Sequence, residues 1–408
     1  MISSQRRIIE LTEYQPTSLP REKLDEDAAE GLWRDYAGQV SVEFPSPKTD
    51  GAWRLTAQGW VGYIPLSPEL GVALRPKVGL SNLFRMLEYA YRLESFRFLD
   101  DMFESSSLTE FYERLARVLA RRVLDRVRQG LYRTYVGREE RLPYVRGRLD
   151  ARRLAQAPWR TDLPCAYQDR TADIEDNRIL AWTLFVVARS GLLSESVAGT
   201  VRKAYHALQG TVTLFPVGAK ACSGRVYNRL NDDYRPLHAL CRFFLDHVGP
   251  TYEVGDRKML PFLVDTARLY ELFVAEWLRA HLPAGVSMVA QEPVVIGDAL
   301  RFNLDVVLYD PATVSALCVL DTKYKAATAP SAEDVEQVVA YAEAKGCGEA
   351  VLVYPSTLTK PLDAKVGKIR VRTLTFSPSS KLDHAGKEFV SKLLSSITLP
   401  PDNLGVVA

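Results

Sequence analysis

The sequence predicts a multidomain α/β protein with a β-rich N-terminal domain, a helical middle region and a C-terminal domain in which helices pack on a mixed sheet. Short apolar runs, separated by Pro, Gly and Asp turn signals, dominate the first hundred residues. Apolar residues at helical spacing dominate the middle, and strand-like runs alternate with helical segments in the last third. A length of 408 residues leaves room for two or three such domains.

Domain boundaries are expected where these patterns change. We place a β-rich domain at residues 1–100 and a mainly helical, arginine-rich linker domain at 101–260. An α/β domain should follow at 261–380, and a C-terminal helix with a polar tail at 381–408.

Periodicity and turn residues also predict the individual elements. The first domain should contain a helix that begins at Ser81, preceded by strands at residues 8–11, 40–44, 53–57, 60–64 and 72–74. The middle region should contain helices at residues 177–189, 195–208 and 236–247. The α/β domain should contain, in order, a helix at 265–281, strands at 294–296, 302–309 and 316–321, a helix at 332–344 and a strand at 350–354.

Cysteine spacing and apolar content exclude several classes of protein. The five cysteines are scattered with no CxxC spacing, so neither a disulfide framework nor a zinc site is predicted. The N-terminus lacks the apolar segment of a signal peptide and no run of 18 apolar residues occurs, so we expect a cytoplasmic protein without a membrane partner. No GxxxxGK[ST] phosphate loop is present, so this chain is expected to bind no nucleotide.

Polar residues interrupt two apolar runs near the C-terminus. Asp305 lies within RFNLDVVLY, and Asp321 and Lys323 lie in CVLDTKYK. Carboxylates in buried strands are costly unless they are paired or share a cation, and alternation along a strand points Asp321 and Lys323 the same way. Such a set suits phosphodiester hydrolysis, in which carboxylates hold Mg²⁺ and the lysine orients water or stabilises the transition state. Taken alone, an Asp-x-Lys is usually a surface ion pair.

The order Asp305, then Asp321-Thr322-Lys323, resembles the signature of PD-(D/E)XK nucleases, although a leucine replaces the proline that often precedes the first aspartate. The resemblance implies a restriction-endonuclease-like nuclease domain in which a glutamate of the preceding helix joins the site, and Glu271 stands at that position. It implies Mg²⁺, which Mn²⁺ can replace, held by Glu271, Asp305, Asp321 and the backbone carbonyl of Thr322. These three carboxylates and Lys323 would be the catalytic groups.

The same superfamily often has a glutamine and a tyrosine on the helix that follows the DxK strand. Gln337 and Tyr341 occupy such positions one helical turn apart, so they lie on one face. The resemblance implies that they contact the DNA backbone or orient the site. Tyr324 and Lys325, directly after the motif, are expected to contact DNA as well.

Segments outside this domain resemble the McrC family, in the order in which that family has them. They are GVALRPKVGLSNLFRMLEYAY at 71–91, YVRGRLDARR at 144–153, ADIEDNRILAWTL at 172–184 and NDDYRPLHALCRFFL at 231–245. The resemblance implies the nuclease subunit of a restriction complex that works with McrB, an AAA+ GTPase ring, stimulates its GTP hydrolysis and cleaves DNA after translocation. It implies contact between the N-terminal domain and the ring, and it leaves open self-dimerisation through the nuclease domain.

The middle region concentrates positive charge. Residues 111–160 contain 14 arginines, no lysine and 5 acidic residues, a local net charge of +9. Such a stretch can neutralise DNA phosphates with strongly salt-dependent affinity, or it can form a solvated face that pairs with acidic groups of this chain or of a partner. Arg146 and Arg148 are the expected DNA contacts, because they lie in a family-like loop.

Two other functions fit part of the same pattern. A stand-alone RecB-like nuclease shares the DxK and Gln–Tyr motifs but does not explain the matched segments between residues 71 and 245. A catalytically silent adaptor that activates a GTPase ring would be expected to have lost a member of the Glu–Asp–Asp–Lys set, which is intact here.

Overall fold

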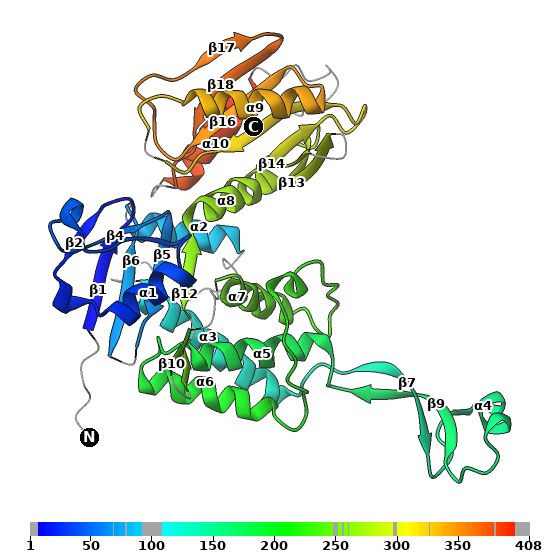
Figure 1. The fold of residues 1–408 in the computed structure, drawn as a ribbon. Helices are drawn as coiled ribbons and strands as arrows, with labels where there is room; N and C mark the ends of the chain where they lie inside the picture. The colour runs from blue at the N-terminus through cyan, green and yellow to red at the C-terminus, as the bar shows by residue number, and fades with distance from the viewer. Residues whose placement is uncertain are drawn as a thin grey trace. The chain divides into compact units, whose positions relative to one another are not determined.

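The computed structural model describes residues 7–67, 69–77, 80–91, 108–247, 252–254, 257–259, 261–296, 300–325, 327–378 and 381–395. The chain divides into two compact units, Met1–Glu104 with Leu263–Ala408, and Ser105–Phe262. The first unit therefore joins the two ends of the chain, and the middle of the sequence forms the second (Figure 1). The expected polar tail lies outside the described residues from position 396 onward.

Short strands form the N-terminal part of the first unit. Its elements are β1 (Arg7–Thr12), β2 (Thr17–Leu19), α1 (Glu26–Asp35), β3 (Val40–Glu43), β4 (Trp53–Ala57), β5 (Trp60–Pro65), β6 (Leu70–Arg75) and α2 (Leu80–Ala90). One sheet has the strand order β1-β6-β5-β12, where β12 is Phe262–Asp265, and a second sheet has the order β2-β4-β3. In the first sheet β1 and β6 are parallel, so their carboxyl ends lie at the same edge.

Alternating burial explains why these segments form strands. In β4, Trp53, Leu55 and Ala57 are buried while the two residues between them are half-buried, so every second side chain faces the core. The five predicted strands and the helix near Ser81 are confirmed. The sequence analysis missed β2 and α1, although Asp25 caps α1 by accepting a hydrogen bond from the backbone N–H of Ala28 at 2.7 Å.

Helices dominate the second unit, and those predicted at 177–189, 195–208 and 236–247 are confirmed. The elements are α3 (Leu108–Gln129), β7 (Thr134–Leu142), β8 (Arg148–Leu149), α4 (Ala151–Gln156), β9 (Leu163–Thr171), α5 (Glu175–Arg189), α6 (Glu195–Leu208), α7 (Tyr234–Asp246), β10 (Tyr252–Val254) and β11 (Arg257–Met259). Helix α3 packs on α6 and α7, and α5 packs on the same two helices.

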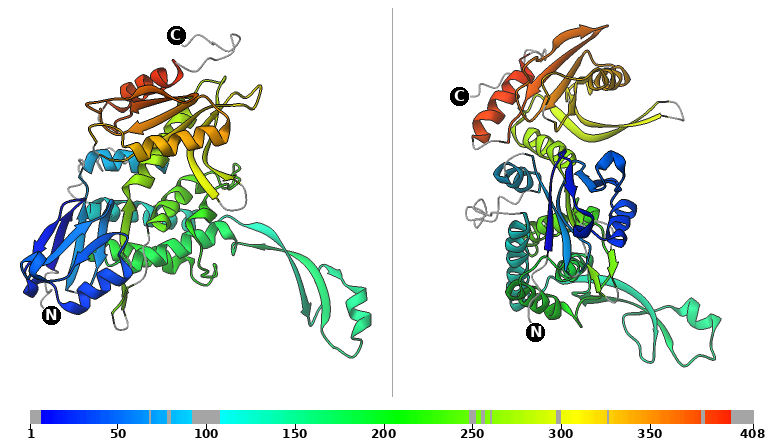
Figure 2. Two further views of the ribbon diagram at one scale, coloured as in Figure 1. Left: turned by 45° about the horizontal axis from the view of Figure 1, so that its top comes forward. Right: turned by 60° about the vertical axis from the view of Figure 1, so that its left-hand side comes forward.

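A long hairpin of β7 and β9, with β8 and α4 at its far end, extends from these helices (Figure 2). The sequence analysis did not predict it. Most residues of β7 are exposed, so neither of its faces has the apolar alternation that identifies a half-buried strand.

A six-stranded mixed sheet forms the C-terminal part of the first unit. Its elements are α8 (Thr266–His281), β13 (Ser287–Ile296), β14 (Leu300–Tyr309), β15 (Ala316–Thr322), α9 (Ala332–Lys345), β16 (Glu349–Tyr354), β17 (Asp363–Val366), β18 (Ile369–Thr375) and α10 (Leu382–Leu394). The strand order is β13-β14-β15-β16-β18-β17, with β15, β16 and β18 parallel and the other pairs antiparallel. All predicted helices and strands here are confirmed, whereas β17 and β18 were not predicted.

Both faces of this sheet are covered by helices, with α9 and α10 on opposite sides (Figure 2). On the α9 face, Val338 and Ala342 pack with Val319 and Leu352 of the sheet. On the other face, Phe376 stacks with Phe273 of α8 and Phe389 of α10, each at a centroid distance of 4.8 Å. Among the described helices, none combines the length and apolar character that crossing a bilayer requires.

Candidate active site

Two neighbouring strands and the helix before them hold the acidic residues that the sequence singled out. Glu271 lies in α8, Asp305 in β14 and Asp321 in β15. The antiparallel register pairs Val306 with Leu320, so the adjoining residues Asp305 and Asp321 lie beside one another where the ladder ends. Both aspartates also act electrostatically on Glu271, so the fold brings the three carboxylates into one cluster.

Polar contacts hold the side chains at this end of the sheet. Oδ2 of Asp305 accepts hydrogen bonds from the backbone N–H and the hydroxyl of Thr322, both at 2.8 Å. Nζ of Lys323 lies 2.8 Å from Oδ2 of Asp321 and donates to Oε1 of Gln337, also at 2.8 Å. Oδ2 of Asp321 is buried, and apart from this ion pair with Lys323 it has no hydrogen-bond partner among the described residues. One ammonium group therefore faces several carboxylate oxygens.

Burial raises the pKa of every carboxyl of the cluster, and neighbouring negative charge adds to the rise at Glu271 and Asp321. Burial, followed by the charges of Asp305, Asp265 and Asp321, raises the pKa of Glu271 to about 8. Burial and the charge of Asp305 raise the pKa of Asp321 to about 6. Burial lowers the pKa of Lys323, but the adjacent Asp321 outweighs it, so that pKa lies above its usual value. The cluster would be stabilised by additional positive charge.

The donor chemistry fits a hard divalent cation. Carboxylate and carbonyl oxygens are the ligands that Mg²⁺ prefers, and the neighbouring side chains of Asp305 and Asp321 supply such oxygens at the end of the ladder. Within the described part of the chain, however, no three acidic, cysteine or histidine side chains converge into a complete metal-binding group. An ion held by Asp305 and Asp321 would therefore take further oxygens from water, from the Thr322 carbonyl or from a shift of Glu271.

The sequence analysis missed Gln291, which lies in β13 beside the carboxylates. The β13–β14 register skips this residue, and its backbone is left-handed, with φ of 53°. A non-glycine residue rarely adopts that conformation within a strand. Nε2 of Gln291 donates to Oε2 of Glu271 at 3.3 Å. Burial raises the pKa of Asp305, and hydrogen bonds from Thr322 and Gln291 offset part of that rise. This left-handed backbone conformation, which hydrophobic periodicity does not reveal, accompanies the contact of Gln291 with the site.

Gln337 and Tyr341 of α9 connect to the site through Lys323. While Oε1 of Gln337 accepts from Lys323, its Nε2 donates to the hydroxyl of Tyr341 at 2.6 Å. The two residues therefore form a hydrogen-bonded chain behind the ammonium group, in which the amide is oriented by the tyrosine and the lysine by the amide.

A second residue of α9 that the sequence analysis missed, Asp334, holds the segment after the motif. Its carboxylate lies 2.5 Å from Nζ of Lys325 and accepts from the buried hydroxyl of Tyr354 at 3.1 Å. Tyr324, between the two lysines, is half-buried, and its hydroxyl has no partner among the described residues. Lys325 is thus exposed but paired, whereas Tyr324 keeps its hydrogen-bonding capacity.

The part of the chain that contains these residues matches a known protein family. The model of the McrBC 5-methylcytosine restriction system component family matches residues 55–355, which include the whole cluster. The chain belongs to the McrBC family. The resemblance to McrC drawn from the sequence is therefore confirmed at the level of the family. Comparison with curated proteins gives no match.

Two solved structures are similar to this McrBC family chain. A refined half-complex from a tetradecameric assembly of Thermococcus gammatolerans McrB AAA+ hexamers with bound McrC has a chain of 17% identity, with a TM-score of 0.53; the match covers 95% of this chain and 99% of that one. The cryo-EM structure of the Thermococcus gammatolerans McrBC complex matches at 18% identity and a TM-score of 0.42, over 67% and 87% of the two chains. The first match shows a shared mixed α/β fold.

Arg146 and Arg148, the remaining predicted site residues, belong to the second unit of this McrBC family chain. Nη2 of Arg146 lies 2.8 Å from Asp169, and its guanidinium lies over the ring of Tyr167 at 3.9 Å. Arg148 opens β8 and is exposed. They are part of the hairpin, and the carboxylate cluster is part of the first unit.

Proposed function

We propose that this chain is the McrC-type, DNA-cleaving subunit of a McrBC-like restriction complex. The observation that carries the proposal is the meeting of Asp305, Asp321 and Lys323 at the end of the β14–β15 ladder. This is the Asp…Asp-x-Lys arrangement of PD-(D/E)XK nucleases, and it stands within the segment that matches the McrBC family. The reaction would be endonucleolytic hydrolysis of DNA, and the mixed sheet would be the nuclease domain.

Mg²⁺, or Mn²⁺ in its place, would supply an activated water and neutralise charge on the phosphate. Asp305 and Asp321 would hold it, with Glu271 and the carbonyl of Thr322 completing the set. Nζ of Lys323 would remain beside the reacting phosphate, where a fixed cation stabilises developing negative charge.

The partner we propose is an AAA+ GTPase ring of McrB type, because the similar half-complex contains McrB AAA+ hexamers with bound McrC. The N-terminal domain is one candidate contact surface, as the resemblance implied. The hairpin of β7 and β9 is a second, because it exposes Tyr135, Tyr144 and Trp159 among arginines. Exposed aromatic and arginine side chains are enriched where proteins bind one another.

Plasmid cleavage tests the proposal directly. Methylated and unmethylated plasmids are incubated with Mg²⁺, with and without the GTPase partner and GTP, beside Asp321→Ala and Lys323→Ala variants. We expect cutting that requires partner, GTP and both residues, with the plasmid preference identifying the licensing modification.

The alternatives predict different patterns. Cutting by this chain alone without GTP would favour a stand-alone RecB-like nuclease. GTPase stimulation without cleavage of any DNA, or cleavage that survives Asp321→Ala, would contradict the proposed active site.

A further inference from the structure

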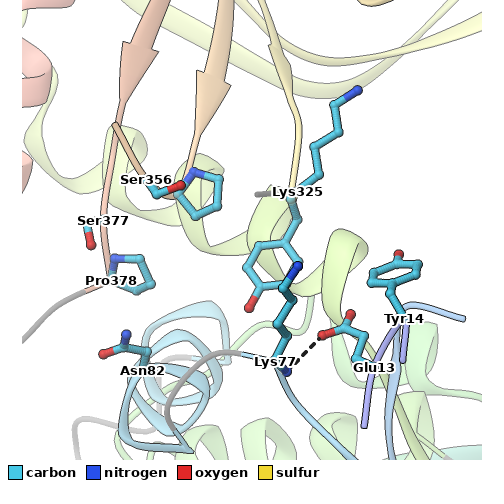
Figure 3. A pocket seen from close by; sticks show the side chains of 10 residues that line it. Glu13, Tyr14, Lys77, Asn82, Lys325, Ser356, Ser377 and Pro378 are labelled. Carbon is cyan, nitrogen blue, oxygen red and sulfur yellow. Dashed lines mark hydrogen bonds between the residues drawn. The ribbon is translucent and has the colours of Figure 1, made fainter. Parts of the chain in front are cut away.

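A pocket of about 670 Å³ lies within the first unit, next to the candidate active site but outside the carboxylate cluster (Figure 3). The carboxyl ends of three parallel strands form one wall. Tyr324 follows β15, Ser356 follows β16 and Ser377 follows β18. The opposite wall comes from the ends of β1 and β6, which contribute Tyr14 and Lys77. Ligands of α/β proteins bind at such carboxyl edges of parallel strands.

Three polar groups in the lining lack partners. Among the described residues, the ammonium of Lys77 makes no ion pair, the side-chain amide of Asn82 makes no hydrogen bond and the hydroxyl of Tyr324 has no partner. Figure 3 shows the side chain of Lys77 reaching into the pocket. Asn82 and Tyr324 are half-buried, and half-buried polar groups are normally satisfied, so these two indicate a ligand with hydrogen-bonding atoms. Lys77 is exposed and supplies an unpaired positive charge at the same pocket.

Apolar surface lines the rest of the pocket. Pro355 and Pro378 belong to the walls, and Tyr14 stands at the pocket with 53% of its surface exposed. The backbone of Tyr14 is left-handed, with φ of 57°, and its N–H donates to the carbonyl of Ala57 at 2.9 Å. An aromatic ring held out in an unfavourable backbone conformation is typical of a binding residue. Aromatic rings beside a cation suit a planar base carrying a phosphate.

Charge distribution sets the orientation of such a ligand. Glu13, buried in the wall, accepts from the hydroxyl of Thr266 at 2.8 Å and from the backbone N–H of Lys77 at 3.2 Å. Its carboxylate would repel a phosphate from the backbone of Lys77, so a phosphate would have to lie at the far end of the Lys77 side chain, which extends away from Glu13 in Figure 3. Lys325 is already paired with Asp334. The phosphate would therefore lie at Lys77, leaving the base against the tyrosines.

We propose that this pocket binds one unstacked nucleotide of the DNA strand being cut, with its base against Tyr14 and its phosphate at Lys77. The proposal rests on the proposed nuclease function, because the pocket wall includes Tyr324, the residue directly after Lys323. A strand whose scissile phosphate lies at the carboxylates would have a neighbouring nucleotide within reach of the pocket.

The test uses the full chain and a duplex with a single-stranded extension that carries 2-aminopurine at successive positions. Ca²⁺ replaces Mg²⁺ so that the strand is bound without being cut. We expect 2-aminopurine fluorescence to be quenched at one position on binding, because the base stacks on a tyrosine. Tyr14→Leu and Lys77→Gln should each weaken binding at that position about tenfold.

A matched control is Phe215→Leu, which removes an aromatic ring that is 58% exposed in the second unit, and it should bind like the wild type. Melting temperatures establish that all variants are folded. Equal quenching and affinity in Tyr14→Leu, Lys77→Gln and wild type would overturn the proposal. Displacement of the oligonucleotide by micromolar free GTP would overturn the assignment to a DNA strand.

Plasmid cleavage separates this proposal from the function on which it rests. If the wild type cuts DNA but the pocket variants bind like it, only the pocket assignment fails. If the wild type cuts no DNA while quenching still depends on Tyr14, the nuclease function fails and the pocket stands as a nucleotide site.

Discussion

Lys323 shows how a single charged side chain is fixed before substrate arrives. Its side chain is 17% exposed, and its ammonium lies 2.8 Å from the Asp321 carboxylate. The amide of Gln337 accepts from it, and the hydroxyl of Tyr341 orients that amide. Because a rotating lysine loses entropy when it engages a phosphate, these contacts reduce the cost of ordering it in the transition state.

Gln291 helps to fix the carboxylates of the cluster, as Gln337 fixes Lys323. Its amide donates to Glu271 and offsets part of the rise that burial causes in the pKa of Asp305, so it supplies partial positive charge between the two carboxyl groups. A bound divalent cation would supply much more positive charge, so the carboxylates would then depend less on the Gln291 amide.

We expect Gln291→Ala to lower the free energy of unfolding in EDTA by about 0.5–1 kcal/mol, because a hydrogen bond to the acidic cluster is lost. In millimolar Mg²⁺ the loss should be smaller, so the metal raises the melting temperature more in the variant than in the wild type. Thermal unfolding with and without Mg²⁺ measures both effects. Gln168→Ala, at an exposed position of β9, is the control, and an equal loss under both conditions would contradict this role.

At the scale of elements, close packing between helices fixes the back of the candidate nuclease sheet. Gly386 of α10 lies against Trp277 of α8, and a Cβ added at Gly386 would stand 1.9 Å from Cζ2 of the indole. No side chain fits there unless one of the helices moves. The glycine is therefore required by packing, since its place in a helix interior is otherwise unfavourable.

Gly386→Ala should consequently destabilise the protein by about 1–3 kcal/mol, as overpacking does elsewhere. Gly199→Ala is the matched control, because Gly199 also lies in a helix, α6, but has nothing within 4 Å of its Cβ position. There the substitution should stabilise by about 0.5–1 kcal/mol. Chemical denaturation of both variants measures the two changes in the free energy of unfolding. A stabilising Gly386→Ala would show that α10 is free to shift.

Helices α5 and α7 of the second unit are joined by a buried histidine. Nδ1 of His238 is bonded to the hydroxyl of Tyr227 at 2.9 Å, and its Nε2 to the carbonyl of Asp176 at 3.1 Å. Burial lowers the pKa of His238 to about 4, although Asp176 raises it in part and Arg225 lowers it further. The folded protein therefore contains the neutral imidazole.

Stability should fall as the pH is lowered from about 6.5 to about 4. Over that interval the unfolded chain binds a proton at this histidine and the folded chain does not, which amounts to about 3 kcal/mol in all. Above pH 6.5 the contribution is constant. His238→Gln, which cannot titrate, should have a smaller slope than the wild type when the free energy of unfolding is measured against pH. Identical slopes would mean that the histidine is protonated in the folded state.

At the scale of the whole molecule, the arginines of the second unit differ in whether they have an acidic partner within the chain. Two aspartates outside residues 111–160 offset part of the net charge of +9 there, because Asp169 pairs with Arg138 and Asp162 pairs with Arg141 and Arg160. The structure therefore favours pairing within the chain for these arginines. Arg148 has no acidic partner among the described residues and is available to another molecule.

Replacing residues 135–170 with a two-residue turn should leave the melting temperature nearly unchanged, because the exposed strand β7 buries little. The ends can be joined since Thr134 and Thr171 are register partners. We expect the shortened protein to lose most stimulation of the GTPase ring, which a GTPase assay with the partner measures. Undiminished stimulation would assign the ring contact to the N-terminal domain.

The sequence by itself determined the elements whose apolar side chains repeat with a clear period, and with them the order Glu271, Asp305, Asp321 and Lys323 on helix and strands. Local periodicity and motif spacing are properties of neighbouring residues, so they can be read without the fold. Only the tertiary structure decided what depends on distant partners. The exposed hairpin of β7 and β9 has no apolar face, and the contact of Gln291 with Glu271 involves a left-handed residue within a strand. The nucleotide-sized pocket needs strand ends more than 200 residues apart in sequence to meet.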